Sequence, residues 1–256
     1  MRDGVLVTGA GGFIGQALVR AGAGGAPHGL ADPPSGTACL VHAGRHPSLG
    51  TPAWRIEDDV EPRLALACAR AGVPFVSLGS RKATTPADAY GYQKAAIEAR
   101  LRAVPDLRLT VLRLGNVFGF EPGRRSFMGA MLDGLRRDGT IRFDMSPFTR
   151  RDFLPVSDAA RMILAVAAVA PSGTFPLGSG VALDCGRLAL AVIRGFGRGR
   201  LVCESPDERD GFVLDPDPLR ALGIEPPNGV AILAEAEALG RCLRDQEARS
   251  ARRQSR

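Results

Sequence analysis

The sequence lacks the features that define several large classes of protein. No apolar run approaches the ~20 residues that a membrane-spanning helix needs, so we predict no membrane partner. The chain enters a strand-like apolar run at its start without the pattern of a signal peptide, which favours a cytoplasmic location. Its cysteines are scattered and form no CxxC pair, so we expect them to be reduced and buried rather than to bind metal. They are Cys39, Cys68, Cys185, Cys203 and Cys242.

Aromatic residues make up only 5% of the 256 residues, which argues against a nucleic-acid surface built on base stacking. The formal net charge is +6, but the basic residues are dispersed along the chain, and the densest cluster is the final SARRQSR. We interpret 246–256 as a solvated basic tail and predict no nucleic-acid partner. A net positive charge also suits an anionic small substrate, so the charge alone does not distinguish a nucleic-acid partner from such a substrate.

Histidine is also scarce, with His28, His42 and His46 as its three positions. None of them stands at metal-ligand spacing from a cysteine or an acidic residue. We therefore predict no metal site.

A glycine-rich turn stands near the start, in VLVTGAGGFIG over residues 5–15. An apolar run precedes the glycines and a helix-compatible run follows them, as in a strand, turn and helix. Gly9 would permit a sharp exit from the strand, Gly12 an approach to a pyrophosphate, and Gly15 close packing of the helix. The helix N-terminus would offer its N–H groups to the phosphates. The alternative is a tight turn that binds nothing.

A second motif, AYGYQKAAIEAR, covers residues 89–100. Thr85 can cap a helix there and Pro86 fits its first position, which puts Tyr90 and Lys94 one turn apart on one face. An ammonium group beside a phenol favours the ionised phenol, a state that a general acid/base must reach. The alternative is a solvated lysine near a half-buried tyrosine.

Together these motifs resemble the extended short-chain dehydrogenase/reductase family, in its NAD-dependent epimerase/dehydratase group. TGAGGFIG and YGYQK carry the resemblance, and three later segments extend it, with gaps, from Val5 to about Pro226. These are LTVLRLGNVFG (109–119), RRDFLPVSDAARMILAV (150–166) and TFPLGSG (174–180). The resemblance implies an α/β fold, namely a Rossmann-like, doubly wound parallel sheet with a small C-terminal substrate lobe.

The resemblance also implies roles for single residues. Tyr90 would donate and accept a proton, Lys94 would hold the nicotinamide ribose, and Ser80 would hydrogen-bond the substrate oxygen. Ser77 is the reserve for Ser80, whose alternative role is to cap a turn. The implied cofactor-binding residues are Gly9, Gly12, Phe13, Ile14, Gly15, His42, Ala43, Tyr90 and Lys94.

The implied reaction is hydride transfer, with NAD or NADP, at a carbon that bears oxygen. Reduction of a ketone needs only this step, and epimerisation reuses it. Dehydratases of the group carry an acidic pair directly after the catalytic serine or threonine. Arg81 and Lys82 stand there in this chain, which argues against dehydration.

The N-terminal half is shorter than this fold requires. We expect 38–44 to be the fourth strand, yet only the Gly- and Pro-rich 21–37 separates it from the first helix. The second and third strands should therefore be missing or reduced to a loop. Asp32 is not at an expected strand end, so the acidic residue that holds the adenosine ribose has no clear counterpart. Arg20 and Arg45 are weak candidates for a 2′-phosphate, which leaves NADP open and NAD preferred.

On the substrate side, Asn116 and Arg151 match positions that touch the substrate and its phosphates in nucleotide-sugar members. The alternatives are a turn asparagine and an arginine paired with Asp152 or Asp158.

The segment 203–226 resembles the family's R-P-G-D region, with Ser205 in place of its arginine. Arg209 or Arg200 could substitute, and we choose Arg209 as the third substrate-binding residue.

We expect a single chain unit with a dinucleotide-binding core, a substrate lobe and a C-terminal helix over 229–245 that packs on the fold or pairs in a homodimer. The core is 1–116 plus 150–173, the lobe is 117–149 plus 174–245, and the tail is 246–256. The predicted function is an NAD(P)-dependent oxidoreductase, a ketoreductase or epimerase acting on a sugar or nucleotide sugar. The alternative is a degenerate member that binds a ligand or partner without redox turnover.

Overall fold

The structure is a computed structural model, and it describes residues 4–254. Contacts divide the chain into two compact units, which are described separately below. The first unit is Met1–Gly115, Val156–Leu177 and Asp215–Pro226, and the second is Asn116–Pro155, Gly178–Leu214 and Pro227–Arg256. Across residues 4–254, no helix has the length and apolar character that crossing a membrane would require.

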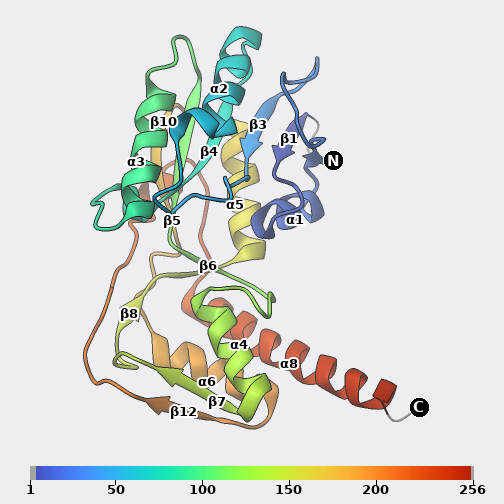
Figure 1. Cartoon of the computed structure of the whole chain (residues 1–256), viewed down its shortest axis with the longest axis vertical. Helices are drawn as coiled ribbons and strands as arrows, with labels where there is room; N and C mark the ends of the chain where they lie inside the picture. The colour runs from blue at the N-terminus through green and yellow to red at the C-terminus, as the bar shows by residue number, and fades with distance from the viewer. Residues whose placement is uncertain (1–3, 255–256) are drawn as a thin grey trace. The chain divides into compact units, whose positions relative to one another are not determined.

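The first unit is built on a sheet of six strands in the order β10-β5-β4-β3-β1-β2, with every neighbouring pair parallel (Figure 1). All residues of β3 and β4 are buried, as expected for parallel strands that are covered on both faces. The strands are β1 (Val5–Thr8), β2 (Gly24–Gly25), β3 (Cys39–His42), β4 (Phe75–Ser80), β5 (Leu109–Leu114) and β10 (Gly173–Leu177). The predicted Rossmann-like parallel sheet is confirmed.

Helices cover the two faces of this sheet because the chain leaves its centre in opposite directions. The crossover β1-α1-β2 and the crossover β3-α2-β4 run outward to opposite edges, and right-handed connections then put α1 and α2 on opposite faces. Helix α1 packs against α5, and α2 packs against α3. The helical segments are α1 (Phe13–Arg20), η1 (Ile56–Asp58), α2 (Val60–Ala71), η2 (Arg81–Ala83), α3 (Ala89–Arg102), α5 (Val156–Val169) and α7 (Asp217–Arg220).

The core between the sheet and α2 and α3 is apolar and fully buried at its centre. Each element contributes side chains to it, which is why α3 is held firmly on the strands. The central members are Leu40, Leu64, Phe75, Ile97, Leu101 and Val111.

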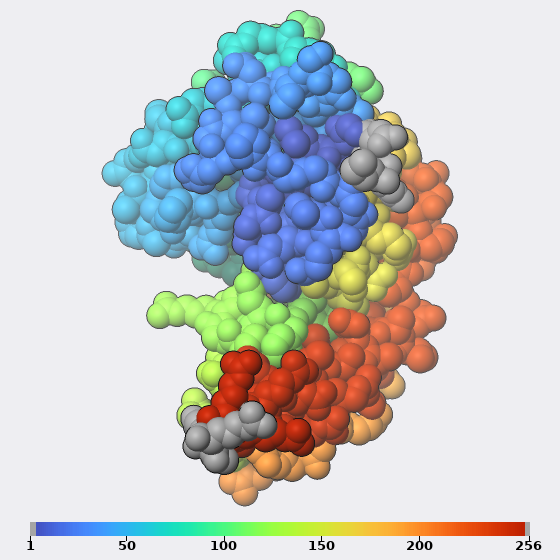
Figure 2. Space-filling model, turned by 90° about the vertical axis from the view of Figure 1, so that its right-hand side faces the viewer, coloured from blue at the N-terminus to red at the C-terminus, as the bar shows by residue number. Residues whose placement is uncertain are grey.

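The edge of the sheet beyond β1 is reduced, as predicted. The second strand survives as the two residues of β2, residues 26–38 contain no strand, and β3 follows on the other side of β1. Pro27, Pro33 and Pro34 in this segment lack the N–H group that a sheet ladder needs. Most of 26–38 is exposed, and Figure 2 shows it, in blue, on the surface of the first unit.

The second unit contains, among its described residues, three helices and three two-stranded sheets. Strands β7 and β12 are parallel, β6 and β9 are parallel, and β8 and β11 are antiparallel. The elements are β6 (Asn116–Phe118), α4 (Phe127–Asp138), β7 (Thr140–Phe143), β8 (Arg150–Arg151), β9 (Phe153–Pro155), β11 (Leu183–Asp184), α6 (Cys185–Phe196), β12 (Arg200–Cys203) and α8 (Gly229–Gln254).

Helices α6 and α8 lie side by side in this unit, and the contact is close. Gly195 on α6 and Gly240 on α8 make it possible, because a Cβ atom at either position would overlap a carbonyl oxygen of the facing helix. The predicted C-terminal helix is present, and five of its apolar residues lie at helical spacing on one face, with Leu233 partly buried and the other four buried. These four are Ile232, Ala236, Leu239 and Leu243.

The contacts divide the chain differently from the expected division at four places. Residue 116 lies in the second unit, and residues 174–177 lie in the first. Residues 150–155 lie in the second unit, because β8 pairs with β11 and β9 pairs with β6 there. Residues 215–226 lie in the first unit, where α7 contacts β10.

Two further expectations need correction. The segment 246–254 is not a separate tail, because α8 continues through it to Gln254, while 255–256 lie outside the described residues. Arginines in the last turn of a helix are favourable near its negative end, which suits this extension. All five cysteines are free, but Cys203 and Cys242 are exposed rather than buried.

Candidate active site

The glycine-rich turn joins β1 to α1, and its glycines are sterically required. Gly9 has a φ of +72°, and a Cβ atom there would overlap the backbone of Gly44. A Cβ atom at Gly15 would overlap the carbonyl oxygen of Gly9, and one at Gly12 would lie 3.2 Å from the same oxygen. The sequence between Thr8 and α1 therefore folds into one compact bend.

The outer side of this bend is open, which fits a phosphate group. Gly12 is the N-cap of α1 and forms no side-chain cap hydrogen bond. A Cβ atom on Gly11 would meet no atom within 4 Å. Phe13 and Ile14 form the first turn of the helix, where the backbone dipole favours an anion. The bend thus has the form that a dinucleotide pyrophosphate requires.

The end of β3 lies beside the bend. The N–H of Ala43 donates to the carbonyl oxygen of Thr8 at 2.9 Å, and the Thr8 hydroxyl lies 2.8 Å from Nδ1 of His42. His42 is buried, and its ring stacks on Phe75. These contacts give His42 a role in joining two strands. Strands β1 and β3 are also where the connections reverse direction, the place at which α/β sheets bind ligands.

Ser80 is the last residue of β4 and is buried. Its Oγ accepts a hydrogen bond from the N–H of Lys82 at 3.3 Å. Ser80 therefore caps η2, which is the alternative role named for it from the sequence. The reserve candidate Ser77 is committed elsewhere, because its hydroxyl donates to the buried carboxylate of Glu61 at 2.5 Å. Ser80 therefore remains the candidate at the strand end.

Helix α3 begins later than predicted. Asp88, rather than Thr85, is its N-cap, and the Asp88 carboxylate accepts from the N–H of Gly91 at 2.8 Å. The ammonium group of Lys82 also donates to this carboxylate, at 2.5 Å. This bond from Lys82 and the one from Gly91 hold the pKa of Asp88 below its usual value.

Tyr90 and Lys94 lie one turn apart on α3, as predicted. Lys94 is only 6% exposed, and its Nζ donates to the carbonyl oxygen of Leu78 at 3.0 Å. Tyr90 is partly buried and packs against the apolar core. The bond to Leu78 ties the helix to β4 two residues before Ser80, so one unit holds all three predicted catalytic residues.

Sequence reasoning missed how the loop after β3 contacts α3. The N–H of Gly50 donates to Oε1 of Gln93 at 2.6 Å, and Nε2 of Gln93 donates to the carbonyl oxygen of Thr51 at 2.8 Å. The guanidinium of Arg45 lies 5.7 Å from the centre of the Tyr90 ring. A glutamine just before the lysine carries no distinctive pattern, so the sequence offers no signal for this contact.

The adenosine side of the site is incomplete. Ala26 and Pro27 follow β2, where a dinucleotide-binding fold places the acidic residue that holds the ribose. Asp32 lies in the exposed segment beyond and pairs with Arg70 at 3.4 Å. Among the described residues, no carboxylate therefore stands at the end of β2.

Asn116, at the start of β6 in the second unit, has an unsatisfied polar group. Its Nδ2 atom is buried and has no hydrogen-bond partner. An unpaired buried amide is costly, and a ligand atom that accepts its hydrogen bond would remove the cost. Asn116 therefore fits the substrate-binding role better than that of a simple turn residue.

Arg151 and Arg209 lie together in the second unit. Nη2 of Arg151 donates to the carbonyl oxygen of Arg209 at 2.8 Å, and its Nε donates to that of Asp210 at 3.1 Å. The guanidinium of Arg151 also lies over the ring of Phe127. Arg209 makes only loose, exposed ion pairs, the shorter being 3.6 Å to Asp144.

Neither of the carboxylates proposed as alternative partners engages Arg151. Asp158 pairs with Arg161 at 3.0 Å. Asp152 is buried, and its carboxylate accepts hydrogen bonds from the hydroxyl of Ser179 and from three backbone N–H groups. These belong to Ser179, Gly180 and Leu214.

Comparison with known proteins gives a class for the part of the chain that contains α3. Residues 60–178 match the model of the NAD dependent epimerase/dehydratase family. The resemblance to the epimerase/dehydratase group is thereby confirmed, and the wider short-chain dehydrogenase/reductase family stays a prediction. The match begins at α2, so the glycine-rich turn lies outside the matched residues.

A curated relative narrows the comparison. The chain is 35% identical over 158 residues to the ADP-L-glycero-D-manno-heptose-6-epimerase of Pseudomonas paraeruginosa (strain DSM 24068 / PA7). This match covers 51% of the chain and 48% of the relative, so it spans about half the length of that protein.

Solved structures share the fold over almost the whole chain. The UDP-N-acetylglucosamine 4-epimerase from Bacillus cereus has a TM-score of 0.76 at 19% identity and covers 94% of this chain and 99% of its own. MoeE5 in complex with UDP-glucose and NAD has a TM-score of 0.71 at 24% identity and covers 93% and 98%. At these identities the likeness defines the fold.

Proposed function

We propose that this chain is an NAD(P)-dependent oxidoreductase of the epimerase/dehydratase type that acts on a sugar or nucleotide sugar. The observation that carries the proposal is the buried Lys94, one helical turn after Tyr90 and hydrogen-bonded beside the strand that ends at Ser80. A buried lysine is rare unless it has a specific task, because burial disfavours its charge. Lys94 meets only a backbone carbonyl in its described hydrogen bond, which leaves its other N–H groups for ribose hydroxyls.

Each of these side chains has a defined part in the proposed reaction. A bound nicotinamide supplies or accepts hydride. Tyr90 exchanges the proton of the substrate oxygen through its Oη, and Lys94 favours the ionised phenol at the moment of transfer. Ser80 donates a hydrogen bond to the same oxygen and stabilises the charge that develops on it.

The proposed cofactor site extends from the bend at Gly9 to Lys94. Gly12, Gly15 and the first turn of α1 would hold the pyrophosphate, and the end of β3 at His42 and Ala43 would border it. Support for this comes from the open space beside Gly11 at the bend. The end of β2 provides no group that distinguishes the two cofactors, so the choice of NAD over NADP stays a prediction.

The proposed substrate class rests on the relatives and on three residues of the second unit. The relatives named above are epimerases of nucleotide-linked sugars, or bind UDP-glucose. Asn116 would bind the sugar, and Arg151 and Arg209 would bind its phosphates. Arg81 and Lys82 after Ser80 favour epimerisation or ketone reduction over dehydration. A homodimer and a cytoplasmic location stay predictions.

A second candidate function is binding of a ligand or partner without redox turnover. The observation that favours it is the missing carboxylate at the end of β2, which would weaken the hold on the adenosine half of a dinucleotide. Such a protein would not use Tyr90, Lys94 and Ser80 for proton transfer, so their combination favours the first function and we rank this one second.

One titration separates the two functions. Calorimetry with NAD, NADH, NADP and NADPH should give saturable binding of at least one form below the millimolar range. The absence of binding by all four would refute the oxidoreductase and favour the second candidate. The preferred form would also identify the cofactor.

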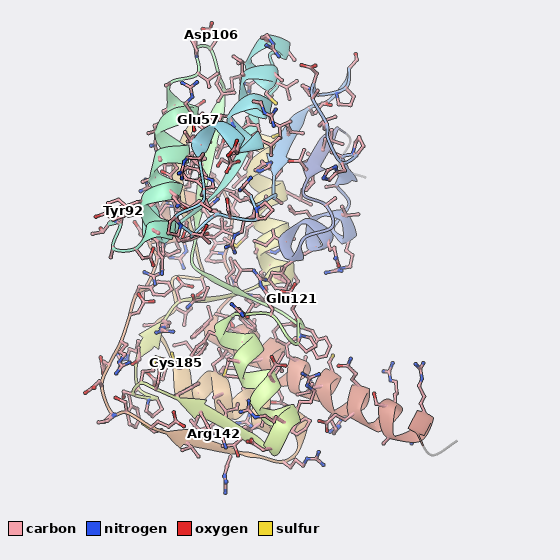
Figure 3. The ribbon with its side chains drawn as sticks, in the orientation of Figure 1. Glu57, Tyr92, Asp106, Glu121, Arg142 and Cys185 are labelled. Carbon is pink, nitrogen blue, oxygen red and sulfur yellow. The ribbon has the colours of Figure 1, made fainter. Side chains whose placement is uncertain are left out.

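Two tyrosine variants then test the proposed proton transfer. In a screen of nucleotide-linked keto sugars and their epimers, Tyr90→Phe should lower turnover by about 10²–10⁴-fold, the usual loss for an acid/base group. Tyr92→Phe is the matched control, since Tyr92 is 64% exposed and points away from α3 in Figure 3. Equal turnover of the two variants would remove Tyr90 from the mechanism.

A further inference from the structure

We infer that Glu98 and Arg113 form a positioning pair, which holds the helix that carries Tyr90 and Lys94 in a fixed place relative to the strand that ends at Ser80. The inference rests on the proposed function, because it gives these two residues a task in that same site. Neither residue touches the reacting groups in this inference, and both act through the elements that they join.

The pair is an ion pair with fork geometry between a buried glutamate and a partly buried arginine. The carboxylate of Glu98 is 1% exposed, and the side chain of Arg113 is 22% exposed. Nη2 of Arg113 lies 2.6 Å from Oε2 of Glu98, and Nε lies 3.1 Å from Oε1 and 3.2 Å from Oε2. A planar guanidinium that meets a carboxylate in this way fixes direction as well as distance.

The position of Glu98 along α3 links the pair to the site. Glu98 follows Lys94 by four residues, so the two lie on one face of the helix in successive turns. Lys94 is bonded to Leu78 of β4, and Glu98 is bonded to Arg113 of β5. Two consecutive turns of α3 are therefore tied to two neighbouring strands.

The sheet is shaped to receive the Glu98 carboxylate. Gly79 is the register partner of Arg113, and a Cβ atom on Gly79 would lie 3.0 Å from Oε1 of Glu98. Glycine there leaves the space that the carboxylate occupies, directly before Ser80.

Arg113 also reaches the segment that follows Ser80. Its Nη1 donates to the hydroxyl of Thr84 at 3.1 Å, and Thr84 is the C-cap of η2, which begins directly after Ser80. One guanidinium thus contacts α3 through Glu98 and the end of β4 through Thr84. Arg102 adds a second, more exposed cation at 3.0 Å from Oε2 of Glu98.

Because the proposed role is geometric, it can be separated from a role of charge. Arg113→Lys keeps the positive charge but cannot form the fork or reach Thr84 at the same time. Arg113→Gln removes the charge as well. If Arg113 only balances the charge of Glu98, the lysine variant should behave as wild type, whereas a positioning role makes both variants differ from it.

The tyrosine content of the chain allows a direct measurement. Tyr90 and Tyr92 are its two tyrosines, so the Tyr92→Phe variant carries Tyr90 as a single tyrosine probe. With ¹³C-labelled tyrosine, the ring signal of Tyr90 is recorded by NMR in this background with and without Arg113→Lys and Arg113→Gln. Arg161→Lys is the control, since Arg161 forms an exposed pair with Asp158 in the same unit. Circular dichroism confirms that each variant is folded.

We expect Arg113→Lys to move the Tyr90 signal and Arg161→Lys to leave it in place. With an active substrate, Arg113→Lys should lower kcat by roughly 10- to 100-fold with little change in KM, as a small misplacement of catalytic groups does. A Tyr90 signal that is the same in wild type and Arg113→Lys would overturn the inference. The NMR measurement needs no turnover, so it decides the inference even where the cofactor titration refutes the proposed function.

Discussion

Gln93 and Gly50 are joined by a 2.6 Å hydrogen bond that links helix α3 to the loop after β3, and a second bond from Gln93 to Thr51 completes the link. Each such bond contributes about 0.5–1.5 kcal/mol, so Gln93→Ala should lower the free energy of unfolding by about 1–2 kcal/mol. Chemical denaturation measures the change. Gln93→Glu keeps the acceptor and loses the donor, so it should lose less stability. An alanine variant as stable as wild type would contradict the link.

The glycine-rich bend supplies a prediction with its own control. Gly15→Ala should destabilise the chain by about 1–3 kcal/mol and abolish nicotinamide binding, because the new methyl group would overlap Gly9 and displace α1. Gly11→Ala should preserve the stability, because its methyl group would meet no atom within 4 Å. Thermal denaturation and calorimetric titration of the two variants test this. Equal loss in both would show that the bend tolerates no side chain at all.

We predict that the stability contributed by the N-cap of α3 depends on pH. Asp88→Ala should cost about 1 kcal/mol, the usual value of a lost cap, while Asp88→Asn should keep the cap and lose the charge. The pKa of Asp88 is lowered from its usual 3.8 by Lys82 and Gly91.

The direction of the pH dependence follows from the lowered pKa of Asp88. The stabilisation by the charged form is complete above pH 3.8 and is lost as the pH falls through the lower folded value. The difference in stability between wild type and Asp88→Asn should therefore be constant from neutral pH to about pH 5 and disappear in stronger acid. Urea denaturation across that pH range measures the difference in stability, and a difference that grows in acid would contradict the prediction.

The cysteines predict a pattern of reactivity. Burial raises the pKa of Cys39 and Cys68 to about 12 and that of Cys185 to about 11, so these thiols hold little thiolate near neutral pH. Cys203 and Cys242 are exposed. A disulfide reagent at pH 8 should thus label two thiols rapidly in the folded chain and all five after unfolding. Rapid labelling of more than two in the native state would disagree with the fold.

Much of the first unit could be predicted because its signals are local. The bend from Gly9 to Gly15 could be recognised from a glycine spacing that lies within one segment, and the face shared by Tyr90 and Lys94 follows from helical spacing alone. The shortened edge was also predictable, since 21–37 has too few apolar residues and too many prolines and glycines for two strands.

The other contacts of the site could not be predicted, because they join segments that are far apart in the sequence. Glu98 and Arg113 meet only because β4 and β5 pair in one register, which places Arg113 beside Gly79. The same holds for Gln93 and the loop at Gly50. Where two local signals competed, the sequence could not choose between them: Thr85 and Asp88 are both good caps, and Asp88 prevails with additional support from Lys82.

The two-residue strand β2 has a consequence for the behaviour of the chain in solution. A sheet that ends on a long, straight strand offers unpaired backbone groups to other molecules and invites association. Here the outermost strand is a pair of glycines, followed within ten residues by Pro27, Pro33 and Pro34. An edge strand this short offers few backbone groups to a strand of another molecule, so the shortening that removed the carboxylate at the end of β2 also protects this edge of the sheet from association.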